Sequence, residues 1–364
     1  MTKLIKRKHT FDGGKITYYS VPILYAIFFM LARTKTKSTK NIKEILYIYR
    51  EWGRDTLVIE ATLESLTRCL GEKRLKQVCI GAMDSIRERI SEEIETNNKF
   101  SHILLDVRAM IDSAFWYQIP KLLLNSALIA RACSKKGITI LCQSPDFNQP
   151  SDRLLSAILT INNGMVLSLA TIPNLVFFPH NRVLWPTPPP PLAKTFCSIE
   201  KIAKEYRRID INMGGTLYEP RKSFYKSIYT VMNERKYNCF FTEKKEIIKY
   251  DEYIDLLQDT KITVLTTCYS GDAKLRQLQG KAMEATAAGS LLFIQDCQSV
   301  RDVFQPWKEC VPFDSLDDIN GIVDLLVYYL ENEEERAKIA LAGYRRMRDY
   351  MEKNEPWANI VGLQ

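Results

Sequence analysis

The sequence predicts an α/β protein with two domains, each a doubly wound, Rossmann-like parallel sheet with helices on both faces. The length of 364 residues suits two domains at roughly 150 residues each. Short β-rich segments alternate with longer helical segments, as in parallel sheets with crossover helices. A proline-rich segment near the middle separates two such series. We therefore expect a first domain over residues 1–185, a linker over 186–204, a second domain over 205–352 and a tail over 353–364.

The composition argues against wholesale disorder and against a membrane-spanning chain. Hydrophobic residues make up 46% and charged residues 26%, as in an ordinary soluble globular protein. The longest apolar run, residues 21–32, has 12 residues, whereas a membrane span needs about 20. A basic tract follows this run from Arg33 in place of a small-residue cleavage site, which does not fit a secretory signal. We expect the run to form a buried helix.

The cysteines and histidines indicate neither a disulfide framework nor a metal site. Nine cysteines are scattered without a C-x-x-C pair, which favours reduced thiols and a cytoplasmic protein. The three histidines, His9, His102 and His180, are too far apart in the sequence to suggest a local cluster. We therefore expect no metal ion and no cofactor.

The first domain is predicted from short β-rich segments separated by helical ones. Residues 119–134 are one such helical segment. The predicted strands cover residues 56–60, 77–80, 102–106, 138–142, 166–169 and 175–178.

Proline marks the predicted boundary between the domains. Seven of the 15 prolines fall between Pro173 and Pro191, and the last four are consecutive. Such a run lacks backbone donors for a helix or a sheet, and it is stiff and extended. The sequence therefore predicts a linker with a cleft between the two domains that it joins.

The second domain shows the cleaner alternation of strands and helices. The predicted strands cover residues 209–213, 238–241, 262–267 and 291–294. The predicted helices cover residues 221–234, 250–257, 280–288, 316–331 and 333–352. Ligands of such sheets bind at the carboxyl ends of the strands.

A first candidate site lies in the segment from residue 209 to Arg221. The predicted strand runs into Gly214-Gly215, and a helix begins within a few residues. Without Cβ atoms the backbone can approach a diphosphate, and the following helix N-terminus favours anions. Arg221 would add a bidentate phosphate contact. The alternative is a tight turn followed by a surface arginine.

A second candidate site lies on the predicted helix from residue 280. Lys281 and Glu284 are three residues apart and therefore share one face of the helix. A cation there suits a phosphate, and a carboxylate can accept hydrogen bonds from both ribose hydroxyls. The alternative is a simple salt bridge between Lys281 and Glu284.

From about residue 205 to 352 the chain resembles the donor-binding domain of GT-B glycosyltransferases, of the group-1-like kind that includes spore-maturation glycosyltransferases. That pattern has a G-[RK]-x-x-E-A-x-x-x-G helix, an apolar strand and a closing pair of helices. The matching positions are Gly280, Lys281, Glu284, Ala285 and Gly289, followed by residues 291–294, 303–304, 311–318, 328–332 and 339–343. Lys281 stands where Arg is more usual, which keeps the charge but loses the fork of donors.

The resemblance implies a GT-B fold, with two Rossmann-like domains facing a central cleft. Gly214, Gly215, Arg221 and Lys281 would hold the diphosphate of a UDP- or GDP-linked sugar, and Glu284 its ribose. The reaction implied is a metal-independent transfer of the sugar to a hydroxyl of a glycan, glycoprotein or lipid-linked acceptor.

One position departs from the family pattern. Retaining members often carry a glutamate eight residues before the ribose-binding one, and here that position is Arg276. Retention or inversion therefore does not follow from the resemblance. Arg276 is either a further diphosphate ligand or a solvated loop residue.

The N-terminal half has a weaker resemblance, to phage DNA glucosyltransferases, in which an aspartate beyond a strand serves as the base. Asp146 follows the predicted strand 138–142 and is our candidate general base, which must lie near the acceptor hydroxyl. Asp106 and Asp112 are competitors, and Asp146 also suits a turn for structural reasons. Gly13-Gly14 resembles the glycine loop after the first strand of this fold, so Gly13, Gly14 and Asp106 are candidates for the acceptor side. A plain turn at Gly13-Gly14 is the alternative.

The positive charge is concentrated at the start of the chain. Residues 1–54 hold 12 Lys or Arg and three acidic residues, a local excess of +9, whereas the whole chain has +8. This segment could attract an anionic surface, a phosphorylated acceptor or a nucleic acid; the alternative is a solvated loop.

Three rival functions stay open at this point. They are a nucleic-acid glucosyltransferase, a non-catalytic GT-B-like protein that binds a nucleotide or a sugar, and an unrelated two-domain α/β binding protein.

Overall fold

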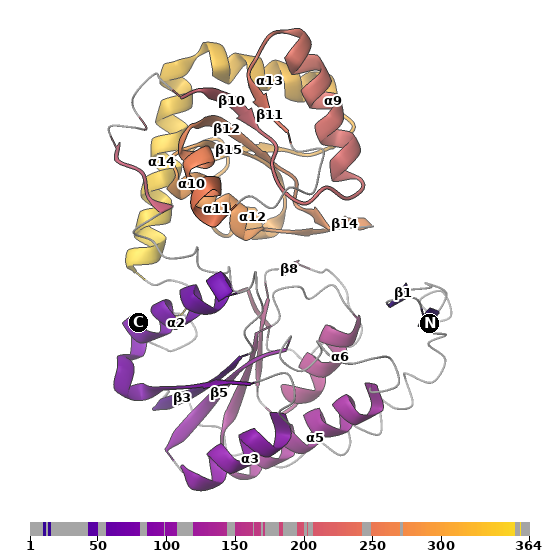
Figure 1. The fold of residues 1–364 in the computed structure, drawn as a ribbon, viewed down its shortest axis with the longest axis vertical. Helices are drawn as coiled ribbons and strands as arrows, with labels where there is room; N and C mark the ends of the chain where they lie inside the picture. Colours follow the sequence, from indigo (N-terminus) through magenta and orange to yellow (C-terminus); the bar gives the residue numbers. More distant parts are fainter. Residues whose placement is uncertain are drawn as a thin grey trace.

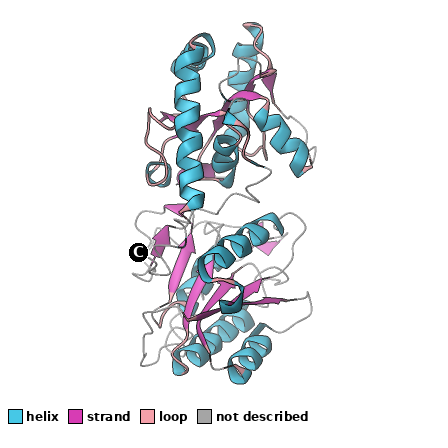
Figure 2. Cartoon of the chain, turned by 90° about the vertical axis from the view of Figure 1, so that its left-hand side faces the viewer, coloured by secondary structure: helices cyan, strands magenta, loops and turns pink. Residues whose placement is uncertain are grey.

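The chain folds around two parallel β-sheets, one in each half of the sequence, which lie one above the other in Figure 1. The computed structural model describes residues 10–11, 14–15, 43–49, 56–80, 86–97, 99–107, 119–143, 150–162, 164–168, 170–171, 182–184, 195–199, 202, 207–241, 249–269, 272–353 and 357. Helices flank the sheet in each half (Figure 2).

The N-terminal half contains a six-stranded sheet in the order β4-β3-β5-β6-β7-β9, parallel throughout. The strands are β3 (Glu44–Tyr49), β4 (Leu75–Cys79), β5 (Phe100–Asp106), β6 (Thr139–Gln143), β7 (Met165–Ser168) and β9 (Arg182–Leu184). The central strands β5 and β6 are buried along their whole length, as expected when helices cover both faces of a parallel sheet.

Alternate residues of β3 pack against different helices. Leu46 and Ile48 belong to a core shared with α3, α5 and α6, whereas Ile45 and Tyr47 belong to a core shared with α2. This alternation follows from the two-residue period of a strand. The helices are α2 (Thr56–Leu70), α3 (Ile86–Thr96), α5 (Ile119–Lys135) and α6 (Pro150–Leu159), and a 3₁₀ turn, η2, covers Glu72–Arg74.

One predicted strand of this half is wrong. Residues 56–60 are rich in β-branched and apolar side chains, but they form the first turns of α2. The segment continues with a helical spacing, so that Ile59, Leu66 and Leu70 are all buried on one face. The amphipathic pattern of all 15 residues therefore overrides the local strand preference.

The other predictions for this half that the structure describes agree with it. The predicted strands 77–80, 102–106, 138–142 and 166–169 correspond to β4, β5, β6 and β7, with ends shifted by one or two residues. The predicted helix 119–134 is α5. Strand β3 and helices α3 and α6 were not among the predicted elements.

The C-terminal half contains a five-stranded parallel sheet in the order β11-β10-β12-β15-β16. Its strands are β10 (Ile209–Asn212), β11 (Cys239–Phe240), β12 (Thr260–Leu265), β15 (Leu291–Gln295) and β16 (Val311–Phe313). Its helices are α9 (Arg221–Glu234), α10 (Tyr250–Gln258), α11 (Gly280–Ala287), α12 (Gln298–Arg301), α13 (Ile319–Glu331) and α14 (Glu333–Glu352).

All the predicted strands and helices of this half are confirmed, and α9 and α14 have the predicted bounds. Helices α9 and α13 pack on one face of the sheet, and α11 and α12 on the other. The long helix α14 contributes to both cores and runs along the side of this half toward the other (Figure 1).

Among the described residues, the halves are joined at strand β8 (Ala170–Thr171) and at Trp357. Strand β8, from the N-terminal part of the sequence, pairs antiparallel with β14 (Asp272–Gln277), which forms a hairpin with β13 (Cys268–Tyr269). Trp357, beyond α14, is fully buried in the core that α2 shares with the N-terminal sheet. The predicted tail therefore contributes to the other half of the molecule.

Several predicted features lie outside the described residues. They are the apolar run 21–32, the basic tract 33–40, the strand 175–178 and the proline run 186–191. Among the described helices, none is long and apolar enough to cross a membrane. All nine cysteines are free thiols.

Candidate functional site

A glycine turn follows β10 at the carboxyl edge of the C-terminal sheet. The buried Asn212 ends the strand, and its Oδ1 accepts a hydrogen bond of 2.7 Å from the Gly214 N–H. Gly215 has φ +128°, a conformation that residues with a Cβ rarely adopt. Helix α9 then begins at Arg221. The predicted strand, Gly-Gly turn and helix are thus confirmed.

The Lys281 ammonium group lies directly against this turn. A Cβ atom on Gly215 would overlap Lys281 Nζ. The sequence separates the two residues, but the fold brings the start of α11 beside the turn after β10. The backbone conformation of Gly215 therefore favours glycine, and any larger residue would also displace the flexible end of the Lys281 side chain.

Lys281 is half-buried beside α10. Its Nζ lies 5.7 Å from the centroid of the Tyr253 ring, on α10. Burial lowers the pKa of Lys281, Glu284 opposes this shift, and the nearby charge of Arg221 adds to it. Among the ion pairs of the described residues there is none between Lys281 and Glu284, although their charges attract one another. A half-buried cation beside the glycine turn favours an anionic ligand.

Glu284 is one turn further along α11, beside α10. Burial raises its pKa to about 7, although the charge of Lys281 and a hydrogen bond from the Tyr253 hydroxyl pull it down. Burial and the Glu284 charge raise the pKa of Tyr253 well above its ordinary value. The tyrosine therefore remains a hydrogen-bond donor, and the carboxyl group titrates near neutral pH.

Arg221 is buried, not a surface residue as in the alternative interpretation. Its Nε donates to Thr266 Oγ1 at 2.7 Å, its Nη1 to the Thr216 carbonyl at 3.2 Å and its Nη2 to the Thr266 carbonyl at 3.3 Å. Its guanidinium also stacks 4.3 Å from the centroid of the Tyr218 ring. Arg221 therefore connects the glycine turn to the end of β12.

Arg276 lies in β14, and not in a solvated loop. Its Nη1 donates to the Asp296 carbonyl at 2.9 Å and its Nη2 to the Asp314 carbonyl at 3.2 Å. In the register of the small sheet it is opposite Thr171 of β8. Arg276 thus ties the inter-domain strand pair to the ends of β15 and β16.

Two glutamines that the sequence reasoning did not select organise the same edge. Gln295 Oε1 accepts from the backbone N–H groups of Thr267 and Cys268, at 3.1 and 3.2 Å. Gln279 Nε2 donates to the Thr266 carbonyl at 3.1 Å, just before α11 begins. The sequence does show that Gln295 directly follows a predicted apolar strand and that Gln279 directly precedes a predicted helix. These positions could have marked both residues as candidates for the carboxyl edge of the sheet.

The N-terminal candidates are only partly within the described residues. Asp106 ends β5, is buried, and lies opposite Gln143 in the register of β5 and β6. The Tyr47 hydroxyl donates to Gln143 Oε1 at 3.4 Å. Burial and the Asp106 charge raise the pKa of Tyr47 well above its ordinary value. These side chains form a polar cluster at the carboxyl edge of the N-terminal sheet.

Asp146 and Gly13 lie outside the described residues. Gly14 begins β2 (Gly14–Lys15), which pairs antiparallel with β1 (Thr10–Phe11) in a separate two-stranded sheet. Among the described strands, the first one of the N-terminal six-stranded sheet is β3. This arrangement favours the plain-turn interpretation of the Gly13-Gly14 segment.

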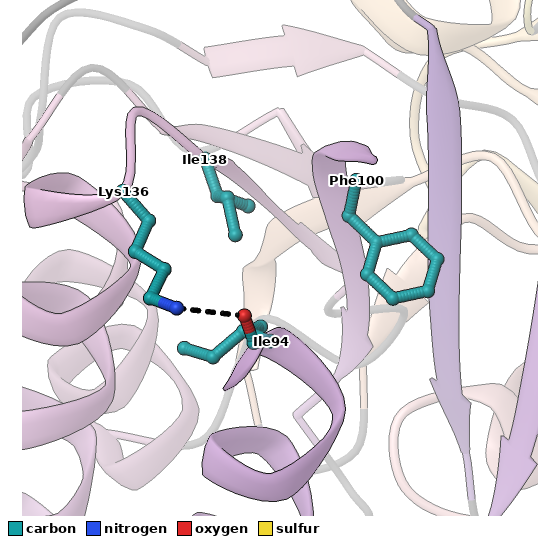
Figure 3. A pocket seen from close by; sticks show the side chains of 4 residues that line it. All are labelled: Ile94, Phe100, Lys136 and Ile138. Carbon is teal, nitrogen blue, oxygen red and sulfur yellow. Dashed lines mark hydrogen bonds between the residues drawn. The ribbon is translucent and has the colours of Figure 1, made fainter. Parts of the chain in front are cut away.

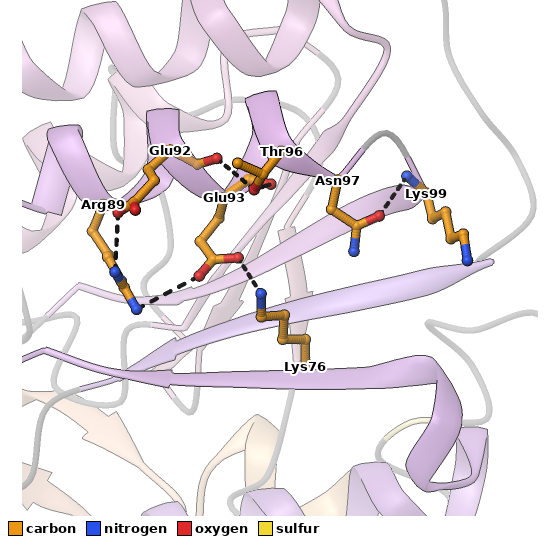
Figure 4. A network of polar contacts seen from close by, with 7 residues as sticks. All are labelled: Lys76, Arg89, Glu92, Glu93, Thr96, Asn97 and Lys99. Carbon is orange, nitrogen blue, oxygen red and sulfur yellow. Dashed lines mark hydrogen bonds and ion pairs between the residues drawn. The ribbon is translucent and has the colours of Figure 1, made fainter.

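Two other features of the N-terminal half lie beside α3. A cavity of about 260 Å³ is lined by Ile94, Phe100, Lys136 and Ile138, and Lys136 Nζ donates to the Ile94 carbonyl at 2.9 Å (Figure 3). Nearby, the buried Glu93 pairs with Lys76 at 2.5 Å and Arg89 at 3.7 Å (Figure 4). Phe100 and Ile138 lie at the start of β5 and just before β6, at the edge opposite to Asp106.

Among the described residues, no group of three or more His, Cys, Asp or Glu side chains could hold a metal ion. The candidate site consists of the glycine turn, Lys281, Glu284 and Tyr253.

Comparison with known proteins supports the resemblance of the C-terminal half. The family model described as glycosyl transferase-like matches residues 199–360, which include the whole of this site. No curated protein matches the sequence. The C-terminal part of the chain, residues 199–360, is therefore similar to glycosyltransferases.

Solved structures of low sequence identity share the fold of this chain. HepE from Anabaena, in complex with UDP and glucose, has a TM-score of 0.54 at 8% identity, covering 88% of this chain and 100% of that one. Sucrose-phosphate synthase from Thermosynechococcus elongatus has a TM-score of 0.52 at 10% identity, covering 88% and 98%. An alpha-glucosyltransferase in complex with UDP-glucose and DNA containing an abasic site has a TM-score of 0.53 at 9% identity, covering 88% and 99%.

Proposed function

We propose that this protein is a glycosyltransferase that moves a sugar from a nucleotide-diphosphate sugar to an acceptor hydroxyl. The observation that carries the proposal is the Lys281 ammonium group, which lies against Gly215 at the glycine turn. A diphosphate beside this turn would place its negative charge next to that ammonium group. HepE in complex with UDP and glucose and the alpha-glucosyltransferase in complex with UDP-glucose, both similar in fold, support a UDP-linked donor; a GDP-linked one is the alternative.

Each of the donor-binding residues would contact a different part of the nucleotide. Gly214 and Gly215 would offer backbone N–H groups and close approach to the diphosphate. Lys281 would contact a phosphate oxygen directly, and Arg221 and Arg276 would add positive charge from their fixed positions. Glu284, once ionised, would accept hydrogen bonds from the two ribose hydroxyls.

We propose that the reaction needs no metal ion. The leaving diphosphate would be stabilised by Lys281, the two arginines and the N-terminus of α11, which carries a partial positive charge. These groups are fixed before the reaction, so little reorganisation accompanies the development of charge.

The acceptor would bind on the N-terminal half, which we propose as a domain of residues 1–185 facing residues 205–352 across a cleft, with residues 186–204 as the linker. Asp146 is the proposed general base, with Asp106 as the competitor because it ends β5 at the carboxyl edge. Gly13, Gly14 and Asp106 remain proposals for the acceptor side. A glycan, glycoprotein or lipid-linked acceptor in the cytoplasm, or at a membrane surface, fits this arrangement.

Nucleotide binding tests the donor site. We expect isothermal titration to show binding of one of UDP, GDP and ADP, and we expect Lys281→Met to weaken it at least tenfold by loss of a charge-assisted hydrogen bond, worth about 1.5–3 kcal/mol. Lys338→Met is the matched control, because the Lys338 side chain is 75% exposed on α14. If none of the three diphosphates binds, or if Lys281→Met binds as the wild type does, the proposal is wrong.

A nucleic acid is the second candidate acceptor. The excess of +9 in residues 1–54 favours it, and one protein of similar fold was solved with DNA. Phosphate contacts release counterions, so the affinity for duplex DNA should fall steeply as salt rises. A salt-independent affinity, or no transfer of labelled sugar to DNA, would leave the glycan-type acceptor as the better proposal.

A further inference from the structure

Helix α10 packs closely against the helix that carries the donor-binding residues. Ile254 and Leu257 of α10 meet Ala285 and Ala288 at the end of α11 in a small buried cluster. The alanines leave room for the two helices to approach each other. This close packing places the side chain of Tyr253 over the face of α11 that carries Lys281 and Glu284.

The single side chain of Tyr253 contacts both of these residues by different atoms. Its hydroxyl donates a hydrogen bond to the Glu284 carboxylate, and its ring face lies 5.7 Å from Lys281 Nζ. The negative face of an aromatic ring attracts a cation. The two groups assigned to the ribose and to the diphosphate are therefore held by one residue from a neighbouring helix.

We propose that Tyr253 is a positioning residue of the donor site, which aims the Glu284 carboxylate at the ribose and holds the Lys281 ammonium beside Gly215. This inference rests on the proposed function, because it assigns Tyr253 a part in binding the same nucleotide. The residue acts through Lys281 and Glu284 and does not itself contact the nucleotide.

The electrostatics of Glu284 make the inference testable by pH. Its ionisation responds to Lys281 on its own helix and to Tyr253 on α10. The Glu284 charge in turn raises the pKa of Tyr250 on α10, and Arg221 on α9 acts on Lys281. The bond from Tyr253 lowers the pKa of Glu284, against the burial that raises it. Removal of the hydroxyl therefore raises that pKa, and ionisation of the carboxylate then needs a higher pH.

The test is a titration of the wild type, Tyr253→Phe and Tyr253→Leu with whichever of UDP, GDP and ADP the wild type binds, and with its 2′-deoxy form, over a range of pH. We expect Tyr253→Phe to weaken binding of the ribonucleotide near about pH 6, by about tenfold for each unit that the pKa of Glu284 rises. The difference in affinity between the wild type and Tyr253→Phe should narrow near about pH 8.5. The 2′-deoxynucleotide should lose less affinity through this substitution than the ribonucleotide does. Tyr253→Leu, which also removes the ring, should bind more weakly at every pH.

The matched control is Tyr250→Phe, one turn away on the same helix. Its ring centroid lies 6.4 Å from that of Tyr253, but its hydroxyl gives no hydrogen bond to Glu284. We expect this variant to keep the pH profile of the wild type. If Tyr253→Phe also keeps that profile, or loses the same affinity for both nucleotides, the inference is wrong while the proposed function stands. If the wild type binds no nucleoside diphosphate, the proposed function itself fails.

Discussion

The Cα of Gly215 and the ammonium group of Lys281 occupy adjoining space, so that a single added carbon at residue 215 would overlap Lys281 Nζ. The glycine follows the first strand of the C-terminal sheet and the lysine begins a helix 66 residues later. The contact unites the two motifs that the sequence offered as separate phosphate sites.

The first prediction concerns Gly215→Ala. The new methyl group meets Lys281 Nζ, and the backbone has φ +128°. We expect the free energy of unfolding to fall by about 1–3 kcal/mol, and nucleotide affinity to fall as well. Denaturant unfolding and titration measure the two effects.

Gly71→Ala is the control for this change. Gly71 also has a positive φ, +76°, but a Cβ there meets nothing within 4 Å. The Gly71→Ala variant should lose stability only because alanine disfavours a positive φ. Its nucleotide affinity should stay that of the wild type. Equal loss of affinity in both variants would show that the contact with Lys281 is unimportant.

The second prediction concerns the pH dependence of Glu284→Gln. The folded-state pKa of Glu284 is about 7, above its ordinary value of 4.5. The native protein therefore holds this proton more tightly than the unfolded chain, and the side chain costs stability as pH rises from 4.5 to about 7. We expect Glu284→Gln to be more stable than the wild type by about 1–3 kcal/mol near pH 8, with the difference vanishing near pH 4.5.

Nucleotide affinity should move in the opposite direction. The wild type should bind better as pH rises through about 7, because the ionised carboxylate accepts two ribose hydrogen bonds. Glu284→Gln should bind weakly without this rise. If Glu284→Gln is no more stable than the wild type at pH 8, the assigned ionisation of Glu284 is wrong.

The third prediction concerns Arg221→Lys. Lysine keeps the charge but cannot reproduce the three donated hydrogen bonds to Thr216 and Thr266. We expect a loss of about 2–4 kcal/mol in the free energy of unfolding, since buried acceptors lose their partners. Arg208→Lys is the control, because its side chain is 73% exposed. Unchanged stability of Arg221→Lys would indicate that the arginine serves the ligand alone.

The fourth prediction concerns Trp357→Ala. The indole is fully buried in the core beneath α2, so its removal should cost about 3–5 kcal/mol. Hydrogen exchange should show a loss of amide protection in α2 and β3, and a smaller loss in α9. Tyr328→Ala, at an exposed site of α13, should change little. Equal loss of protection in α9 and α2 would contradict the packing of this tail on the N-terminal half.

The sequence predicted most of the C-terminal half because its periodic patterns are local. Helices α9 and α14 have the bounds that the apolar spacing predicts. The hairpin of β13 and β14 was missed, because β14 is a polar segment, DAKLRQ, whose partner Ala170–Thr171 is about a hundred residues away. No pattern within one segment can show such a pairing.

The candidate site was predictable in part for the same reason. Gly214-Gly215 and the spacing of Lys281 and Glu284 are visible in the sequence. The part of Tyr253 is not, because it depends on how closely α10 packs on α11. The raised pKa of Glu284 likewise comes from burial by residues distant in the chain.

The connections between the halves at the β8–β14 pair and at Trp357 have a mechanical consequence. Two separate points of attachment define a line, and rotation about that line disturbs them least. Arg276 lies in the β8–β14 pair, at one end of this line, and its guanidinium donates hydrogen bonds to carbonyls that follow β15 and β16. We therefore expect a hinge rotation of the two halves about an axis that passes close to the proposed diphosphate site. The acceptor side would move the most relative to the donor pocket, which lies near the axis.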